Sequence, residues 1–268
     1  MKQLILFLKG AFMGASMLIP GVSGGTMAII LGIYDKLIKA VSNFLHSPKK
    51  NFFYLGIVAL GGMIGMLLFS KALLHLTELY RMPMMYLFLG AVIGSIPLLC
   101  TKAKVKSFSF SVFFFPAVGL AIILLLNSLS SEMVAFSTLT GTVKTLVIIA
   151  AGLIAAIALV LPGISVSYML LILGMYEPAL TAIEHLDFTF LIPLGLSILA
   201  GIFLSTKGLS YCMEKHTQKT FLIIIGFVLG SVPEVFPGLP VGNDILFCLL
   251  TLLLGIAAIL ALSRYAND

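Results

Sequence analysis

The sequence predicts an all-α polytopic membrane protein with two inverted-topology repeats, each containing a re-entrant helical hairpin, and about six full transmembrane helices besides the two hairpins. Three observations support this fold class. Hydrophobic residues make up 60% of the 268-residue chain and charged residues only 10%. Two long uncharged stretches are each interrupted by Pro-Gly. The residues around one interruption recur around the other.

The composition is that of a chain whose solvent is largely lipid. Mean hydropathy is +1.19, whereas a soluble domain is nearer half apolar and a quarter charged. The net charge of +6 is expected to reflect Lys and Arg on cytoplasmic loops, so no nucleic-acid partner is expected. The three cysteines form no C-x-x-C pair and the four histidines lack metal-ligand spacing, so we expect neither a metal nor a cofactor.

Stretches without Asp, Glu, Lys or Arg mark the predicted membrane segments. A helix needs about 20 apolar residues to cross a bilayer, and most of these stretches are long enough for one crossing. No linker typical of an aqueous domain separates them, so residues 1–268 are expected to form a single transmembrane domain. In chain order the stretches are 10–34, 52–70, 82–101, 107–131, 145–176, 188–206, 220–233 and 245–263.

The first and fifth stretches are unusual because each contains Pro-Gly in its interior, at Pro20-Gly21 and at Pro162-Gly163. Proline lacks the backbone donor and clashes with the preceding turn, so a helix is expected to break at each of these positions. Exposed backbone polar groups are tolerated at membrane depth only inside protein or beside a wet cavity. The two breaks are therefore expected to meet near the bilayer midplane.

The two broken stretches belong to an internal repeat. P-G-V-S-G-G-T at 20–26 corresponds to P-G-I-S-V-S-Y at 162–168, an offset of 142 residues. I-I-L-G-I-Y-D at 29–35 corresponds to L-I-L-G-M-Y-E at 171–177 at the same offset, and G-S-I-P at 94–97 to G-S-V-P at 230–233. The repeat units are expected to cover about 4–100 and 145–236, with extra spans at about 107–131 and 245–263.

Charge distribution predicts the relative orientation of the units. If both broken stretches are hairpins that enter and leave on one side, 13 basic residues lie inside and two outside, with Lys71 set aside within a span. If each crosses once, the distribution becomes eight and seven. The positive-inside rule favours the hairpins, which makes the repeats inverted and both termini cytoplasmic. A pair of proline-kinked spanning helices is the alternative.

The residue types at the two breaks suit an anion. Glycines allow close backbone approach, hydroxyls donate hydrogen bonds, and helix N-termini carry a partial positive charge. The alternative is that Ser and Thr only cap their own helices while the glycines allow helices to cross. The candidate substrate-binding residues are Pro20, Gly21, Val22, Ser23, Gly24, Gly25 and Thr26 in the first loop, and Pro162, Gly163, Ile164, Ser165, Ser167 and Tyr168 in the second.

Few ionisable residues fall within the predicted spans. Lys71 and Lys207 occupy matching positions in the repeats and could attract an anionic headgroup at each mouth, or could be boundary lysines that snorkel. Glu234 could carry a coupling proton or lie at the interface. No Ser-His-Asp order, carboxylate pair or His-carboxylate cluster is found in the spans, so we expect no enzymatic activity.

The segments G-A-S-M-L-I-P-G-V-S-G-G-T-M-A-I-I-L-G-I-Y-D at 14–35 and L-P-G-I-S-V-S-Y-M-L-L-I-L-G-M-Y-E-P at 161–178 resemble the bacterial PopT-type polyprenyl-phosphate transporter family. The resemblance covers nearly the whole chain. It implies a translocase of the bacterial cytoplasmic membrane that returns undecaprenyl phosphate, the lipid carrier of cell-wall precursors, to the inner leaflet. It also implies that the two loops hold the phosphate headgroup. We expect the headgroup to cross by alternating access around these loops while the prenyl chain remains in lipid.

The chain departs from the family pattern at two positions. Met17 stands where an acidic residue is frequent, which argues against a proton or cation role there, and Val166 stands where glycine is frequent, which makes the second loop bulkier. A transporter of a small soluble anion and a membrane enzyme acting on lipid phosphate are the alternative functions. The expected partners are a polyprenyl-phosphate lipid and the membrane itself, with a homo-oligomer as a further possibility.

Overall fold

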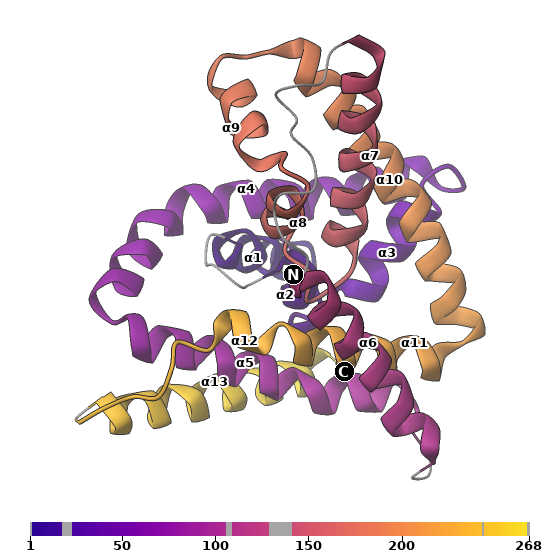
Figure 1. Ribbon diagram of the computed structural model, residues 1–268. Coiled ribbons are helices and arrows are strands. Elements are labelled where there is room, and N and C mark those ends of the chain that lie inside the picture. Colours follow the sequence, from indigo (N-terminus) through magenta and orange to yellow (C-terminus); the bar gives the residue numbers. More distant parts are fainter. Residues whose placement is uncertain (1, 18–22, 106–108, 129–140, 243, 267–268) are drawn as a thin grey trace.

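A computed structural model describes residues 2–17, 23–105, 109–128, 141–242 and 244–266, and within these ranges all regular structure is helical (Figure 1). Most of the uncharged stretches became helices, as the composition predicts. The helices are α1 Lys2–Ser16, α2 Gly24–Ile30, α3 Tyr34–Ser42, α4 Pro48–Leu79, α5 Arg81–Lys102, α6 Phe110–Ser128, α7 Gly141–Val160, α8 Val166–Ile172, α9 Tyr176–Glu184, α10 Phe188–Lys215, α11 Thr217–Gly230, α12 Val232–Val235 and α13 Asp244–Ala266.

The helices from α7 to α11 repeat the order of short and long helices seen from α1 to α5. In both runs a helix is followed by a break, a helix of seven residues, a helix of nine residues and then a long helix, α4 with 32 residues or α10 with 28. The chain turns between α2 and α3 at Gly32, and between α8 and α9 at Gly174, both with positive φ. These turns lie in the matching I-L-G-I-Y and I-L-G-M-Y segments of the sequence.

The four most extensive helix pairs in the described structure are α1 with α4, α7 with α10, α5 with α13, and α6 with α11. Glycines allow these backbones to approach closely. A Cβ added at Gly14 would lie 2.1 Å from the Gly62 carbonyl oxygen, and one added at Gly90 would lie 2.1 Å from the Leu252 oxygen. Such close contact between small residues stabilises helix pairs in lipid, where the hydrophobic effect does not drive association.

Within the described residues, five helices are long and apolar enough to cross a bilayer, and many large apolar side chains remain exposed on their surfaces. The chain is therefore a multi-pass membrane protein. The five segments lie in α4, α5, α7, α10 and α13, while α1, α6 and α11 are apolar but shorter. At about 1.5 Å per residue, the 20 residues of α7 extend about 30 Å, which is the full hydrocarbon thickness of a bilayer. The first arm of the second broken segment is therefore as long as a complete crossing rather than half of one.

The short helix α2 lies at the centre of the arrangement, where it contacts α1, α3, α5, α7 and α13 (Figure 1). Six of its seven residues are buried. Next to it, the buried Tyr34 hydroxyl at the start of α3 donates a hydrogen bond to the Val160 carbonyl oxygen over 2.9 Å. Because the last carbonyls of a helix have no partner within it, this bond both satisfies the end of α7 and joins the two halves of the chain.

Candidate functional site

The two Pro-Gly segments contact each other directly. The Gly163 backbone N–H donates to the Thr26 hydroxyl oxygen at 3.1 Å and to the Ser23 hydroxyl oxygen at 3.2 Å. These residues come from positions more than 130 residues apart in the chain. The structure thus brings the described parts of the two predicted loops together, in the interior of the protein.

Ser23 and Thr26 form a pair of hydroxyls at the start of α2. The Ser23 oxygen caps the helix by accepting the Thr26 backbone N–H at 3.1 Å, and the two hydroxyl oxygens lie 2.8 Å apart. Each hydroxyl has one hydrogen to donate, and the bond between them uses one of the two. Among the described contacts the second hydrogen is uncommitted, and so is able to donate to an oxyanion.

The Ser23 hydroxyl has both a local role, as a helix cap, and a contact with the opposite loop. Ser23 does cap its own helix, as expected if it only supported local structure. It also binds the opposite loop, which a local cap does not require. The Gly163 N–H is occupied by the hydroxyls in this conformation, so the hydroxyl hydrogen rather than this amide is the donor available to a ligand.

The second loop is fixed against α11. Gly163 has φ +81°, a conformation that residues with a side chain rarely adopt. A Cβ at this position would lie 2.4 Å from the Phe227 carbonyl oxygen. Pro162 beside it is fully buried. The sequence therefore needs glycine here both for the turn and for close packing on α11.

In the first loop, two adjacent glycines have different neighbours. A Cβ at Gly25 would lie 3.0 Å from the Pro162 Cα and 3.1 Å from its nitrogen, which are backbone atoms of the opposite loop. A Cβ at Gly24 would lie 3.0 Å from the Met17 sulfur, the flexible end of a side chain. Gly25 therefore sets the distance between the loops, whereas Gly24 does not.

We expect Gly25→Ala to push the two loops apart and to lower thermal stability, because overpacking against backbone costs about 1–3 kcal/mol. Gly24→Ala is the matched control, since the Met17 side chain can move and alanine favours the helix over glycine. The midpoint temperature for loss of the monodisperse peak after heating in detergent measures both variants. Equal midpoints for the two would contradict the assigned contact.

Of the remaining loop residues, two make packing or backbone contacts in the structure, and the others lie wholly or in part outside the described residues. Ile164 is 7% exposed and packs in an apolar cluster with Ile123 and Phe227, so it anchors the loop. The Ser165 carbonyl accepts the Met169 N–H at the start of α8. Pro20, Gly21 and Val22 lie outside the described residues, as do the side chains of Ser167 and Tyr168, although both of these belong to α8.

The ionisable candidates lie on other parts of the fold. Lys71 on α4 and Lys207 on α10 are exposed, and the Lys207 ammonium lies 4.3 Å from the centre of the Phe203 ring. No described hydrogen bond or ion pair joins either lysine to the two loops. Glu234 belongs to α12, but its side chain is outside the described part.

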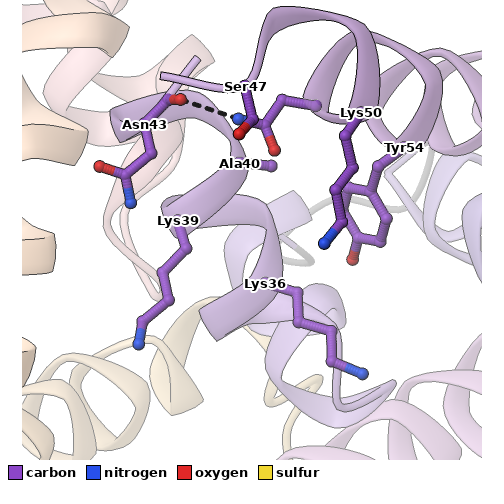
Figure 2. A pocket seen from close by; sticks show the side chains of 8 residues that line it. Lys36, Lys39, Ala40, Asn43, Ser47, Lys50 and Tyr54 are labelled. Atoms are coloured by element: carbon purple, nitrogen blue, oxygen red, sulfur yellow. Dashed lines mark hydrogen bonds between the residues drawn. The ribbon is translucent and has the colours of Figure 1, made fainter. Parts of the chain in front are cut away.

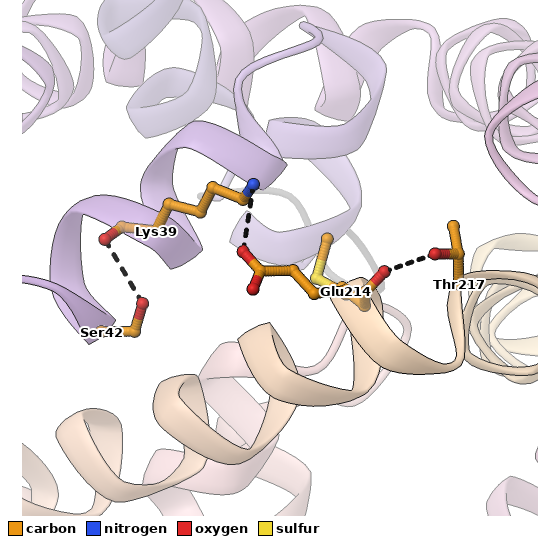
Figure 3. A network of polar contacts seen from close by, with 5 residues as sticks. Lys39, Ser42, Glu214 and Thr217 are labelled. Carbon is orange, nitrogen blue, oxygen red and sulfur yellow. Dashed lines mark hydrogen bonds and ion pairs between the residues drawn. The ribbon is translucent and has the colours of Figure 1, made fainter.

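Sequence reasoning missed two ion pairs near α3. Lys102 of α5 binds Asp35 at 2.5 Å. Lys39 of α3 binds Glu214 of α10 at 3.2 Å, as Figure 3 shows. The partners are 67 residues or more apart in sequence, so no local spacing could indicate them. Across the described residues, no group of three or more His, Cys, Asp or Glu side chains could hold a metal ion.

Comparisons with known proteins give matches over most of the chain. Residues 13–244 match the model of the undecaprenyl phosphate translocase-like family. A polyprenyl-phosphate transporter from Staphylococcus aureus is 35% identical over 275 residues, covering 98% of this chain and 97% of that protein. One from Vibrio cholerae is 28% identical over 252 residues, covering 88% of this chain and 79% of that protein. No solved structure matches the chain.

These names describe transporters and not enzymes. The family match covers both Pro-Gly segments and every helix from α2 to α12. The resemblance suggested by the two motifs is therefore confirmed, and this chain belongs to the undecaprenyl phosphate translocase-like family.

Proposed function

We propose that this protein translocates undecaprenyl phosphate across the bacterial cytoplasmic membrane and returns it to the inner leaflet. The observation that carries the proposal is end-to-end similarity to a protein named as a polyprenyl-phosphate transporter, which covers 98% of the chain. The all-helical, apolar architecture supports it, since five described helices are able to cross a bilayer. A carrier lipid with a charged headgroup cannot cross hydrocarbon unaided at useful rates because exposing the charge to lipid is costly.

The phosphate headgroup is held where the two loops meet. The Ser23 and Thr26 hydroxyls and the Gly163 turn lie together there. One uncommitted hydroxyl hydrogen is able to bind a phosphate oxygen, and hydrogen bonds to a charged group are the stronger kind. Alternating access moves this junction from one side to the other while the prenyl chain stays in lipid. Lys71 and Lys207, exposed on α4 and α10, attract the headgroup to the two mouths.

The topology proposed for this cycle has inverted repeats, hairpins at both breaks, and both termini in the cytoplasm. The Lys39–Glu214 ion pair supports it, because single crossings at both breaks would place these residues on opposite sides of the membrane (Figure 3). Charges on the parts of the chain that precede and follow each broken segment also act on one another. The charges of Lys9 and Lys36 act on one another. The pKa of Asp187 is lowered mainly by its hydrogen bond with Thr189 and, in smaller part, by Lys144.

Cysteine labelling in intact cells tests this topology. In a background without the native cysteines, Lys49→Cys and Lys104→Cys are expected to react only after the reagent reaches the cytoplasm. Arg81→Cys is expected to react from outside. Labelling of Lys104→Cys and Lys215→Cys from opposite sides of the membrane would exclude the hairpin at the second break, because both topologies place positions 49 and 104 on one side.

Proteoliposomes containing labelled undecaprenyl phosphate in one leaflet test the function itself. We expect the purified protein to move the lipid to the other leaflet without changing it chemically. Release of inorganic phosphate would replace the proposal with an enzyme acting on lipid phosphate. Uptake of a soluble anion with no lipid movement would replace it with a small-anion transporter.

A further inference from the structure

A cavity lined by three lysines lies between α3 and the start of α4, and none of its lining residues belongs to the two loops (Figure 2). Its volume is about 440 Å³, within the usual range for small-molecule sites. Lys36 and Lys39 extend from α3 on one side, and Lys50 and Tyr54 from α4 on the other. The rest of the lining is Ala40, Asn43, Ser47 and Asn51, so no carboxylate lines the cavity.

The positive charge of this cavity is only partly compensated. Glu214 pairs with Lys39, and the nearby Asp35 is bound to Lys102. Among the described residues, neither Lys36 nor Lys50 has an acidic partner. The charge of Lys9 on α1 adds to the repulsion at Lys36. Like charges gathered in one cavity raise the energy of the empty site, and an anion would relieve that repulsion.

Tyr54 adds an independent indication of a ligand. Its hydroxyl is shielded from solvent and has no hydrogen-bond partner in the described structure. Buried tyrosine hydroxyls usually find a partner, because leaving one without costs about 1–3 kcal/mol. Tyr54 is one of the residues that line the cavity, so an acceptor bound beside it would satisfy the hydroxyl. The cavity itself is held in shape from within, since the Asn51 side-chain amide donates to the Asn43 carbonyl at 2.8 Å.

We propose that the cavity between α3 and α4 is a second phosphate-binding site, in which Lys36, Lys50 and Tyr54 hold a phosphate group. An acceptor with two or more negative charges matches two uncompensated ammonium groups and one hydroxyl donor. The site lies at the polar start of α4, whose following residues Phe52 and Phe53 are exposed apolar side chains. A phosphate monoester with an apolar tail fits that boundary, and free phosphate shares the same headgroup chemistry. The proposal does not depend on the transport role of the loops.

Site-resolved acetylation of lysines, read by mass spectrometry, tests this on the full chain in neutral detergent. We expect farnesyl phosphate to protect Lys36 and Lys50 from the reagent while farnesol does not. Lys49 and Lys104 are the internal controls, because both are exposed and neither lines the cavity. Tyr54→Phe keeps the ring and removes the hydroxyl. It is expected to raise the half-protecting concentration of farnesyl phosphate about tenfold, as loss of a hydrogen bond to a charged group predicts.

Parallel samples with sodium phosphate alone distinguish the two sources of the ligand. Protection by sodium phosphate identifies a site for the free anion, whereas protection only by farnesyl phosphate identifies a site for a lipid headgroup. Equal protection of Lys36, Lys50, Lys49 and Lys104, whether by farnesyl phosphate or by phosphatidylglycerol vesicles, would show an unspecific charged surface and overturn the proposal. So would an unchanged half-protecting concentration in Tyr54→Phe. Thr26→Val in the loops is expected to leave the protection intact, so failure at one site is separable from failure at the other.

Discussion

Gly163→Ala is expected to abolish transport and to lower thermal stability more than any other single methyl addition at the loops. The new Cβ would lie 2.4 Å from the Phe227 carbonyl oxygen and 2.7 Å from its carbon, and neither can move without shifting α11. The backbone also has φ +81° there, where a residue with a side chain is strained. Together the strain and the overpacking are expected to cost roughly 2–6 kcal/mol. Heating in detergent, followed by size-exclusion chromatography, measures the loss.

Substitutions at two other glycines separate the effect of backbone strain from the effect of overpacking. Gly238→Ala shares the positive φ, at +98°, but has no atom within 4 Å of the added Cβ, so it measures strain alone. Gly208→Ala lies within α10 in open space and is expected to behave like the wild-type protein or to be slightly more stable. A Gly163→Ala protein with the wild-type midpoint and transport rate would show that the turn at the loop junction is not required.

The sequence predicted the all-helical fold and the positions of the breaks, because both depend on local chemistry. Proline interrupts a helix wherever it stands in the interior, and uncharged runs of this length favour membrane helices. Which helices pair could not be predicted in this way. The α5–α13 and α6–α11 pairs join segments far apart in the chain. Their faces are specified by the fit of glycines such as Gly90 and Gly226 against a distant backbone.

In the candidate site, too, the local features were predictable from the sequence and the contacts between distant segments were not. The residue types of the loops indicated hydroxyl and glycine chemistry, and the expectation that the breaks meet agrees with the contact of Gly163 with Ser23 and Thr26. The direction of that contact was not predictable, because no local pattern indicates that a backbone amide of one loop donates to two hydroxyls of the other. The role of Tyr34 was not predicted either. Its hydroxyl donates a hydrogen bond to the Val160 carbonyl oxygen at the end of α7, and nothing in the sequence near Tyr34 indicates this partner.

Thr26→Val is expected to reduce undecaprenyl phosphate transport by about 10- to 100-fold while the protein still folds. Valine keeps the shape of the side chain, which is 3% exposed, but removes the hydroxyl that accepts from Gly163 and pairs with Ser23. A hydrogen bond to a charged ligand contributes about 1.5–3 kcal/mol, and each 1.36 kcal/mol changes a rate about tenfold. The structural loss is smaller, because Ser23 still accepts the Gly163 N–H. The measurement is the initial rate in proteoliposomes at matched protein content.

Thr206→Val is the matched control. Thr206 is 1% exposed on α10, and its hydroxyl donates only to carbonyls of its own helix, those of Ile202 and Phe203, among the described contacts. Thr206→Val is therefore the same chemical change at a comparably buried position, and no described hydrogen bond joins Thr206 to either loop. Thr26→Ser should restore transport, because the hydroxyl and its bonds return while the methyl group does not. If both valine variants slow transport equally, the hydroxyl at Thr26 acts only through packing. If Thr26→Val transports at the wild-type rate, the headgroup does not bind at the junction of the loops.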